Sequence, residues 1–490
     1  MTKEQNAAQS PDEAQKTPKP FTQETMVETR HSVVIDGQTV TYKATAGTLV
    51  LKTDEDEPKA SLFFVAYTRD DVEDPAQRPI TFSFNGGPGS SSVWLHLGVL
   101  GPRRVLMDDE GFPLPPPARL TDNEHSLLDV TDLVFIDPVS TGYSRVPPGE
   151  EAQDYHGVEQ DIESVGEVIR RYTTRFQRWA SPKFLIGESY GTTRAAGLAG
   201  YLQNRYGMYL NGVMLISVVL DFQTIRFDVG NDLPYILYLP TYAATAWYHG
   251  CLGDDAPADL DALLAEVAAF AQGEYTLALM QGDALPAEER ARIAQKLAAY
   301  TGLTADYIER THLRIDIMRF VKELLRDRRR TVGRLDSRFI GIDRDAAGES
   351  FAFDPSYAAI QGTYSAAFNH YVRAELTFES DLLYEVLGSL YQSWNYGKHQ
   401  NQYLNVAETL RAAMCQNPHL RVFVANGYYD LATPHLATEY TFNHMQLDES
   451  LRDNVSMAYY ASGHMMYVQL AALVKLKADL AAFIRGAIPD

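Results

Sequence analysis

One short glycine-flanked segment carries a serine in a setting suited to nucleophilic catalysis. Residues 187–191, GESYG, fit the pattern G-x-S-x-G, in which the serine lies on a sharp turn from a strand to a helix. The apolar run FLI leads into the segment, and an amphipathic helix is expected to follow it. Glycine admits the close backbone approach of such a turn, and a helix N-terminus favours developing negative charge. Because the pattern also occurs by chance, an ordinary strand–helix turn stays the alternative.

Two later segments supply the acid and the base that a serine nucleophile needs. The strand RVFVAN leads into GYYD, which ends at Asp430, and NVSMAYYAS leads into GH, which ends at His464. The imidazole could take the proton from Ser189, while Asp430 would fix its tautomer and stabilise the imidazolium. The chain order serine, acid, histidine is that of the α/β-hydrolase triad. We therefore predict Ser189, Asp430 and His464 as the catalytic residues.

Two other residues are rival candidates for the acid and the base. His435 falls in HLATEYTFNHM, which favours a helix, and Asp137 precedes the serine in the chain. Both residues are more often structural in such positions, so they remain alternatives to the predicted pair.

A glycine-rich segment, NGGPGSSS at residues 85–92, follows an early predicted strand. Glycine there lets a backbone N–H approach a developing oxyanion, with the N–H of Tyr190 as the second donor. A phosphate-binding loop is disfavoured, because the spacing is not G-x-x-x-x-G-K-[ST] and no lysine follows.

The elements around these segments alternate between strand and helix. PITFSFN, DLVFID, KFLIG and NGVMLIS are typical of buried strands, and the segments between them show helical periodicity. Upstream, HSVVIDGQTVTYKATAGTLVLK alternates on both sides of Asp36-Gly37, which predicts a hairpin. The predicted class is α/β: an α/β-hydrolase fold with a mostly parallel central sheet and helices on both faces.

The strand pattern stops near Phe222 and resumes near residue 406. The intervening text, for example DLDALLAEVAAFA and PAEERARIAQKLAAY, is typical of helices. We predict a catalytic domain from residues 29–222 and 406–490, with a helical cap inserted at 223–405. Residues 1–28 are rich in Lys, Glu, Gln, Pro and Thr, which predicts a disordered leader.

Charge and composition limit the partners. The 490 residues include 43 Lys and Arg against 64 Asp and Glu, a formal net charge of −21. This balance disfavours nucleic acid and anionic lipid as partners. Neither a signal peptide nor an 18-residue apolar stretch is evident, so a cytoplasmic protein without a membrane partner is expected. The sequence leaves a homodimer open.

The two cysteines and the absence of metal or nucleotide motifs predict that no metal or cofactor is bound. Cys251 and Cys415 are too few for a disulfide scaffold. Two buried free thiols are favoured, and a single bridge between them stays open.

Taken together, the motifs resemble those of the serine carboxypeptidase family, of the carboxypeptidase Y and cathepsin A type. NGGPGSSS resembles that family's NGGPG-x-SS loop, with Ser90 where a cysteine is usual. DPVSTGYS resembles its DQPVG-x-GFS segment with one residue absent, and GESYG, GYYD and SGHM resemble its nucleophile, acid and histidine loops. These matches span about residues 79 to 468.

The resemblance implies a peptide substrate that loses C-terminal residues through an acyl-enzyme on Ser189. It implies that Gly87 and Tyr190 supply the oxyanion N–H groups. It places three residues where the family holds the substrate's C-terminal carboxylate, namely Asn85, Gly86 and Glu188. A glutamic acid suits this task when protonated, because two carboxylates in contact cannot both stay charged.

Val99 stands where the family's second carboxylate-binding glutamate belongs, three residues before Pro102. The family's pair of glutamates is linked to its preference for acidic pH. We hypothesise that this chain holds the carboxylate with Asn85 and a cationic residue such as Arg194, and works nearer neutral pH. An acid from the cap is the alternative.

Aromatic residues offer a substrate cleft or an ordinary core. Trp94 and the cap segment LPYILYLPTYAATAWYHG could line a cleft, and Met465 matches a family methionine near the active site. Packing alone would explain each of them equally well.

Two other functions compete with carboxypeptidase activity. An esterase or acyltransferase would use the same triad, because fold does not fix function. A non-catalytic binding protein could retain the fold, although the intact triad and both oxyanion loops argue against it.

Overall fold

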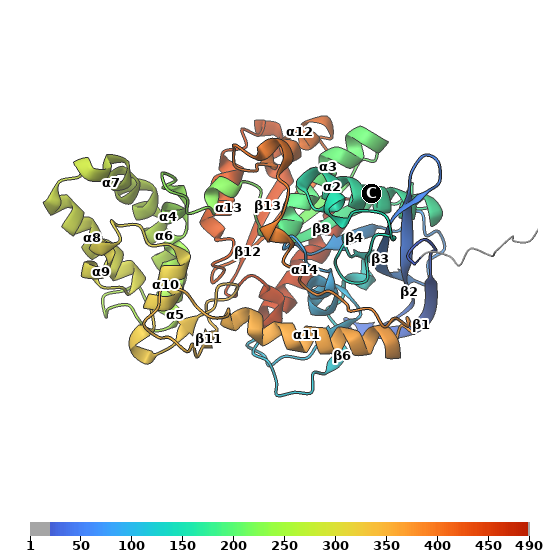
Figure 1. Cartoon of the computed structure of the whole chain (residues 1–490), viewed down its shortest axis with the longest axis horizontal. Helices are drawn as coiled ribbons and strands as arrows, with labels where there is room; N and C mark the ends of the chain where they lie inside the picture. The colour runs from blue at the N-terminus through green and yellow to red at the C-terminus, as the bar shows by residue number, and fades with distance from the viewer. Residues whose placement is uncertain (1–19, 489–490) are drawn as a thin grey trace, which may run out of the picture.

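A nine-stranded sheet is the central feature of the computed structural model, which describes residues 20–488 (Figure 1). Its strand order is β1-β2-β3-β7-β4-β8-β9-β12-β13. The first three strands, which form an antiparallel edge, are β1 (Met26–Ile35), β2 (Gln38–Lys52) and β3 (Pro58–Arg69). β7 pairs antiparallel with β3 and parallel with β4, and every later pair is parallel. The strands of this parallel part are β7 (Asp132–Ile136), β4 (Ile80–Phe84), β8 (Lys183–Ser189), β9 (Gly212–Val218), β12 (Arg421–Gly427) and β13 (Val455–Tyr460).

The predicted hairpin joins β1 to β2. Asp36 and Gly37 form its two-residue turn with φ values of 48° and 77°, as a type I′ turn requires. β1 begins at Met26, so the prediction of a leader over residues 1–28 is wrong at its end, because Met26–Glu28 pair with β2 and Val27 packs against the core. Residues 1–19 lie outside the described part of the chain.

Each face of the sheet carries its own hydrophobic core, because successive strand residues point to opposite faces. Leu185 of β8 packs in one core with α2 (Val158–Arg175), α3 (Tyr190–Tyr206) and α12 (Ala407–Gln416). Its neighbour Ile186 packs in the other core with α14 (Leu470–Gly486) and α11 (Pro355–Ala374). Helices therefore cover both faces, as the sequence predicts.

The helices after β9 form a separate group at one side of the sheet (Figure 1). They are α4 (Leu233–Leu237), α5 (Leu239–Tyr248), α6 (Leu260–Phe270), α7 (Thr276–Gln281), α8 (Ala287–Thr301), α9 (Ala305–Arg310) and α10 (Ile317–Glu323). Their shared core includes Tyr242 and Phe320, and it also takes in Leu431 from the loop after β12. We call this group the cap.

Residues 360–386 pack with the body rather than with the cap, although the sequence analysis assigns them to the insertion. Tyr364 and Phe368 of α11 lie in the same core as α14. α11 runs from the cap toward the body beneath the sheet in Figure 1. The remaining short elements are α1 (Val93–Leu95), α13 (His435–Asn443), and the strand pairs β5 (Arg103–Val105) with β6 (Leu120–Asp122) and β10 (Thr331–Val332) with β11 (Ile340–Gly341).

Both cysteines are free thiols. The prediction of unpaired cysteines is confirmed, but the prediction that both are buried is wrong. Cys251 is half-buried, and Cys415 lies on the exposed side of α12, with its Sγ 3.5 Å from Nη1 of Arg411. Across residues 20–488, the helices lack the length and apolar character that crossing a membrane demands.

Candidate active site

Ser189 stands at the junction of β8 and α3. Its backbone has φ 60° and ψ −130°, a conformation that residues with side chains rarely adopt. The neighbouring glycines make the turn possible: a Cβ on Gly187 would clash with the backbone of Gly191, and a Cβ on Gly191 would lie 2.7 Å from the carbonyl oxygen of Phe84. The strained turn lifts the serine to the wall of a cavity at the carboxyl edge of the parallel strands.

Asp430 and His464 follow the ends of β12 and β13 and meet beside this cavity. Nδ1 of His464 lies 2.7 Å from Oδ2 of Asp430. Because Nδ1 of His464 is engaged by Asp430, Nε2 is the nitrogen left for the hydroxyl of Ser189. Ser189 and His464 both line the cavity. The hydrogen bonds within residues 20–488 include none between Ser189 and His464; such contacts commonly tighten only when substrate binds.

The buried Asp430 carboxylate is held by several donors. Oδ1 accepts hydrogen bonds from the backbone N–H groups of Ala432, at 2.7 Å, and Thr433, at 3.0 Å, and Oδ2 accepts one from the Thr433 hydroxyl at 2.7 Å. Burial lowers the pKa of His464, but the Asp430 carboxylate more than offsets this effect, so that the pKa lies above its usual value. This environment favours the imidazolium that proton abstraction would create.

The glycine-rich loop lies directly against the start of α3. A Cβ on Gly86 would clash with the backbone nitrogen of Tyr190, so glycine lets the two backbones touch. Tyr190 is the first residue of α3, and its N–H therefore has no partner within the helix. Gly87, at φ 104°, and Tyr190 both line the cavity beside Ser189. The structure thus brings both predicted oxyanion residues to the wall of the cavity that Ser189 lines.

Glu188 is a buried carboxyl group with both oxygens engaged. Oε1 accepts a hydrogen bond from Nδ2 of Asn85 at 2.9 Å, and Oε2 accepts one from the Tyr467 hydroxyl at 2.6 Å. Burial raises the pKa of Glu188 to about 7, against the lowering effects of His464, Tyr467 and Asn85. Asn85, Gly86 and Glu188 all line the cavity, as a site for a substrate carboxylate would require.

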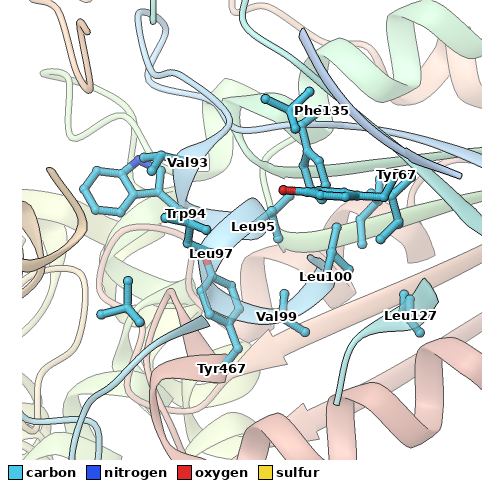
Figure 2. Close-up of a cluster of buried hydrophobic side chains, with 14 of the residues drawn as sticks. Tyr67, Val93, Trp94, Leu95, Leu97, Val99, Leu100, Leu127, Phe135 and Tyr467 are labelled. Atoms are coloured by element: carbon cyan, nitrogen blue, oxygen red, sulfur yellow. The ribbon is translucent and has the colours of Figure 1, made fainter. Parts of the chain in front are cut away.

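Tyr467 is the functional candidate that sequence reasoning misses. Its ring packs so closely on Gly98 that a Cβ there would clash with it. The neighbouring Val99 lies fully buried in the same hydrophobic cluster (Figure 2). A phenol thus hydrogen-bonds Glu188 in a chain that has no glutamate at position 99. Only the position of Tyr467 three residues after His464 could have drawn attention to it.

Arg194 cannot recognise a substrate carboxylate, so this part of the hypothesis is wrong. Its side chain is buried, with Nε donating to Asp161 at 2.8 Å and Nη1 donating to the carbonyl of Asn85 at 2.5 Å. The guanidinium therefore connects α3 to α2 and to the glycine-rich loop, because Arg194 lies on the buried face of α3.

The rival residues take structural positions. His435 begins α13, where burial lowers its pKa to about 4. Asp137 follows β7, and its Oδ1 accepts a hydrogen bond from the N–H of Ser92 at 2.8 Å, which fixes the end of the glycine-rich loop. Burial raises the pKa of Asp137 to about 7. Neither residue lines the cavity that holds Ser189.

The cavity has a volume of about 640 Å³, and several aromatic side chains line it. Trp94 and Met465 line it and also belong to a buried core, so each fits both alternatives of the sequence analysis. The tyrosine-rich cap segment contributes Tyr238 alone, because Tyr242 packs in the cap core. The other aromatic lining residues are Phe222, Phe351, Tyr357, Tyr391 and Tyr396. Two arginines, Arg226 and Arg334, also line it.

Comparison with solved structures identifies the architecture. The crystal structure of KEX1(delta)p, a prohormone-processing carboxypeptidase from Saccharomyces cerevisiae, superposes with a TM-score of 0.56. The match covers 96% of this chain and 93% of that chain, at 15% sequence identity. The chain adopts the α/β-hydrolase fold, which confirms the predicted fold class.

Curated relatives match over shorter segments. Serine carboxypeptidase-like 45 of Arabidopsis thaliana is 25% identical over 210 residues, which cover 41% of this chain and 40% of the relative. The pheromone-processing carboxypeptidase KEX1 of Saccharomyces cerevisiae is 33% identical over 156 residues, which cover 30% of this chain and 20% of the relative. The matched segments therefore span less than half of either relative.

A family model covers far more of the sequence. The model described as serine carboxypeptidase matches residues 36–478, a range that includes the glycine-rich loop, the serine turn and both late loops. The resemblance inferred from the motifs is thus confirmed over most of the chain. The chain belongs to the serine carboxypeptidase family.

Proposed function

We propose that this chain is a serine carboxypeptidase that releases C-terminal residues from peptides through an acyl-enzyme on Ser189. The observation that carries the proposal is the hydrogen bond of 2.7 Å from His464, which lines the same cavity as Ser189, to the buried Asp430. Family membership supports the same chemistry.

The reaction follows from the positions of the side chains. Nε2 of His464 takes the proton of the Ser189 hydroxyl as its oxygen attacks the carbonyl carbon of the last peptide bond. The N–H groups of Gly87 and Tyr190 donate to the oxyanion that forms. The imidazolium then protonates the leaving amine, the C–N bond breaks, and the acyl group remains on Ser189. In the second half of the reaction, His464 takes a proton from water as the water oxygen attacks the acyl carbon. The bond between the acyl group and Ser189 then breaks, the imidazolium returns the proton to the serine oxygen, and the shortened peptide acid is released.

Glu188 can help to hold the carboxylate of the departing residue. Because its pKa lies at about 7, a large share of the carboxyl groups is protonated at neutral pH and can donate a hydrogen bond. The pKa of about 7 is also consistent with an enzyme that works nearer neutral pH.

An esterase or acyltransferase is the second candidate. The observation that favours it is the engagement of both Glu188 oxygens by Asn85 and Tyr467, together with Val99 where a second glutamate would stand. If Glu188 has no oxygen free to hydrogen-bond the substrate, the site has less reason to require a C-terminal carboxylate.

A comparison of substrates tests the proposal. Blocked dipeptides, their C-terminal amides and p-nitrophenyl esters are offered to the parent enzyme and to Ser189→Ala. A carboxypeptidase hydrolyses the free acid and loses most of its rate on the amide, and Ser189→Ala loses at least about 10³-fold in kcat. Rates that are equal on acid and amide, with faster ester cleavage, would support the second candidate. Failure of Ser189 to react with a fluorophosphonate would contradict both.

A further inference from the structure

Arg334 is a half-buried arginine in the wall of the active-site cavity. Its backbone N–H donates to Oδ1 of Asp354 at 3.1 Å. Among the hydrogen bonds and ion pairs of residues 20–488, none involves its guanidinium. This charged group therefore lies at the site without a protein partner.

The more deeply buried arginines Arg194 and Arg338 each carry a counter-ion. Arg338 donates to Asp336 at 2.7 Å, and Arg194 donates to Asp161 at 2.8 Å. A charge that is partly removed from water without a partner costs free energy, because nothing replaces its lost hydration. Arg334 departs from this pattern at the place where a substrate must bind.

The backbone fixes Arg334 beside the catalytic loops. Its carbonyl accepts a hydrogen bond at 3.1 Å from the N–H of Leu431, the residue after Asp430. The carbonyl of the next residue, Leu335, accepts one at 2.7 Å from the N–H of His464. The guanidinium is thus presented from a segment that is tied to both the acid and the histidine loops.

Tyrosines aside, the ionisable side chains of the cavity wall are Arg226, Arg334, Asp354, Glu188 and His464, in a chain with a net charge of −21. The carboxylate of Asp354 is occupied by the backbone N–H of Arg334 and by the hydroxyl of Ser356 at 2.5 Å. Arg226, the second lining arginine, is exposed and donates to the Tyr396 hydroxyl at 3.2 Å. An anionic group that enters the cavity meets two arginines that form no ion pair within residues 20–488, and Arg334 is the more buried of the two.

We infer that Arg334 binds a carboxylate of the substrate. The planar guanidinium matches a carboxylate through two parallel N–H···O bonds, and a partly dry cavity strengthens them. The inference rests on the proposed hydrolase function and deepens it, because it assigns a specificity determinant. The carboxylate has two sources, the free C-terminus and an Asp or Glu side chain next to the cleaved bond.

Matched substrate pairs distinguish the sources. One pair is blocked Phe-Leu with a free or an amidated C-terminus; the others exchange Glu for Gln at the penultimate or the final position. kcat/KM is measured for the parent, Arg334→Gln, Arg334→Lys and the control Arg310→Gln. Arg310 is an exposed arginine of α9 that pairs with Asp306 at 2.8 Å, outside the cavity.

We expect Arg334→Gln to reduce the acid-to-neutral ratio of kcat/KM about 10- to 100-fold in one of these pairs, as loss of a charge-assisted contact does. Arg334→Lys restores part of the ratio, and Arg310→Gln leaves it unchanged. The pair that responds identifies the source. Ratios within twofold of the parent in every pair, with hydrolysis retained, overturn the inference while the proposed function stands.

Binding without turnover separates failure of the inference from failure of the proposed function. In the Ser189→Ala background, calorimetric titration with the same peptide acids is expected to give a Kd at least about 10-fold weaker when Arg334→Gln is added. Equal Kd values, or no binding of any peptide acid to Ser189→Ala, overturn the inference. Binding that depends on Arg334 in a chain that hydrolyses none of the substrates would uphold the inference and contradict the proposed function.

Discussion

Glu188 is a residue of the cavity wall whose protonation changes within the neutral pH range. Its carboxyl group is almost fully buried between Asn85 and Tyr467, and burial raises its pKa from 4.5 to about 7. In the unfolded chain the proton leaves near 4.5, whereas in the folded chain it stays until about 7. The folded state therefore binds the extra proton between these values, and this group's contribution to stability falls as the pH rises through that window.

Glu188→Gln should remove this pH dependence. A neutral amide keeps the volume of the protonated acid and has no proton to lose. The variant's free energy of unfolding should therefore rise relative to the parent's between pH 4.5 and about 7, by about 3 kcal/mol in total. Urea unfolding of both proteins at a series of pH values measures the difference. A difference that is constant with pH would contradict the assignment.

Asp430→Asn tests the acid of the triad. The asparagine can hydrogen-bond Nδ1 of His464 but supplies no negative charge, and it can favour the wrong tautomer. We expect kcat to fall about 10³- to 10⁴-fold. Because the Asp430 carboxylate holds the pKa of His464 above its usual value, the acidic limb of the kcat/KM profile should move to lower pH. Asp448→Asn, an exposed control, should keep the parent profile.

At the scale of elements, contact between the glycine-rich loop and the start of α3 builds the oxyanion site. A Cβ at Gly86 would push the loop away from the N–H of Tyr190. Gly86→Ala should therefore lower kcat at least about 100-fold, and circular dichroism should show whether the fold is retained. Gly253→Ala is the matched control, because a Cβ there meets nothing within 4 Å. Equal kcat values for both variants would mean that the loop does not serve the reaction.

Strand ends explain why so much of the site was predictable. Ser189, Asp430 and His464 each follow an apolar strand, so their convergence follows from a parallel sheet. Residues on other elements gave no such signal. Tyr467 reaches Glu188 across 279 positions, and neither side of that contact has a local pattern. Arg194 is buried in α3 and paired with Asp161, whereas Arg334 lines the cavity from a loop, and this difference depends on packing that sequence spacing does not reveal.

Helix periodicity also did not reveal whether a helix packs in the cap or against the catalytic body. The sequence predicts helices between β9 and β12, and the structure has them. α11 nevertheless packs Tyr364 and Phe368 against the body rather than the cap. An amphipathic stripe specifies that a face is buried, whereas the partner of that face is decided by tertiary packing.

At the scale of the whole molecule, the cap should unfold separately from the body that the sheet and its two cores form. The cap core and the two sheet cores share few residues, so calorimetry should show more than one transition. Phe320 is fully buried in the cap and stacks on Tyr242 with ring centroids 4.1 Å apart. Phe320→Ala should reduce the free energy of unfolding of the cap by about 3–5 kcal/mol and lower the midpoint of its transition. Leu410→Ala in α12 should destabilise the body instead and lower the midpoint of the body transition. A single transition that moves equally in both variants would contradict this.

Leu431 makes the cap difficult to exchange. This leucine is completely buried in the cap core, yet a single peptide bond joins it to Asp430. A chimera that replaced residues 233–323 with the helices of a relative would keep every predicted triad residue. It would still lose the hydrophobic pocket of the cap in which Leu431, the residue after Asp430, is buried. A successful graft of the cap would therefore have to carry a pocket for that leucine with it, besides the cap contacts to Tyr429 and Leu436.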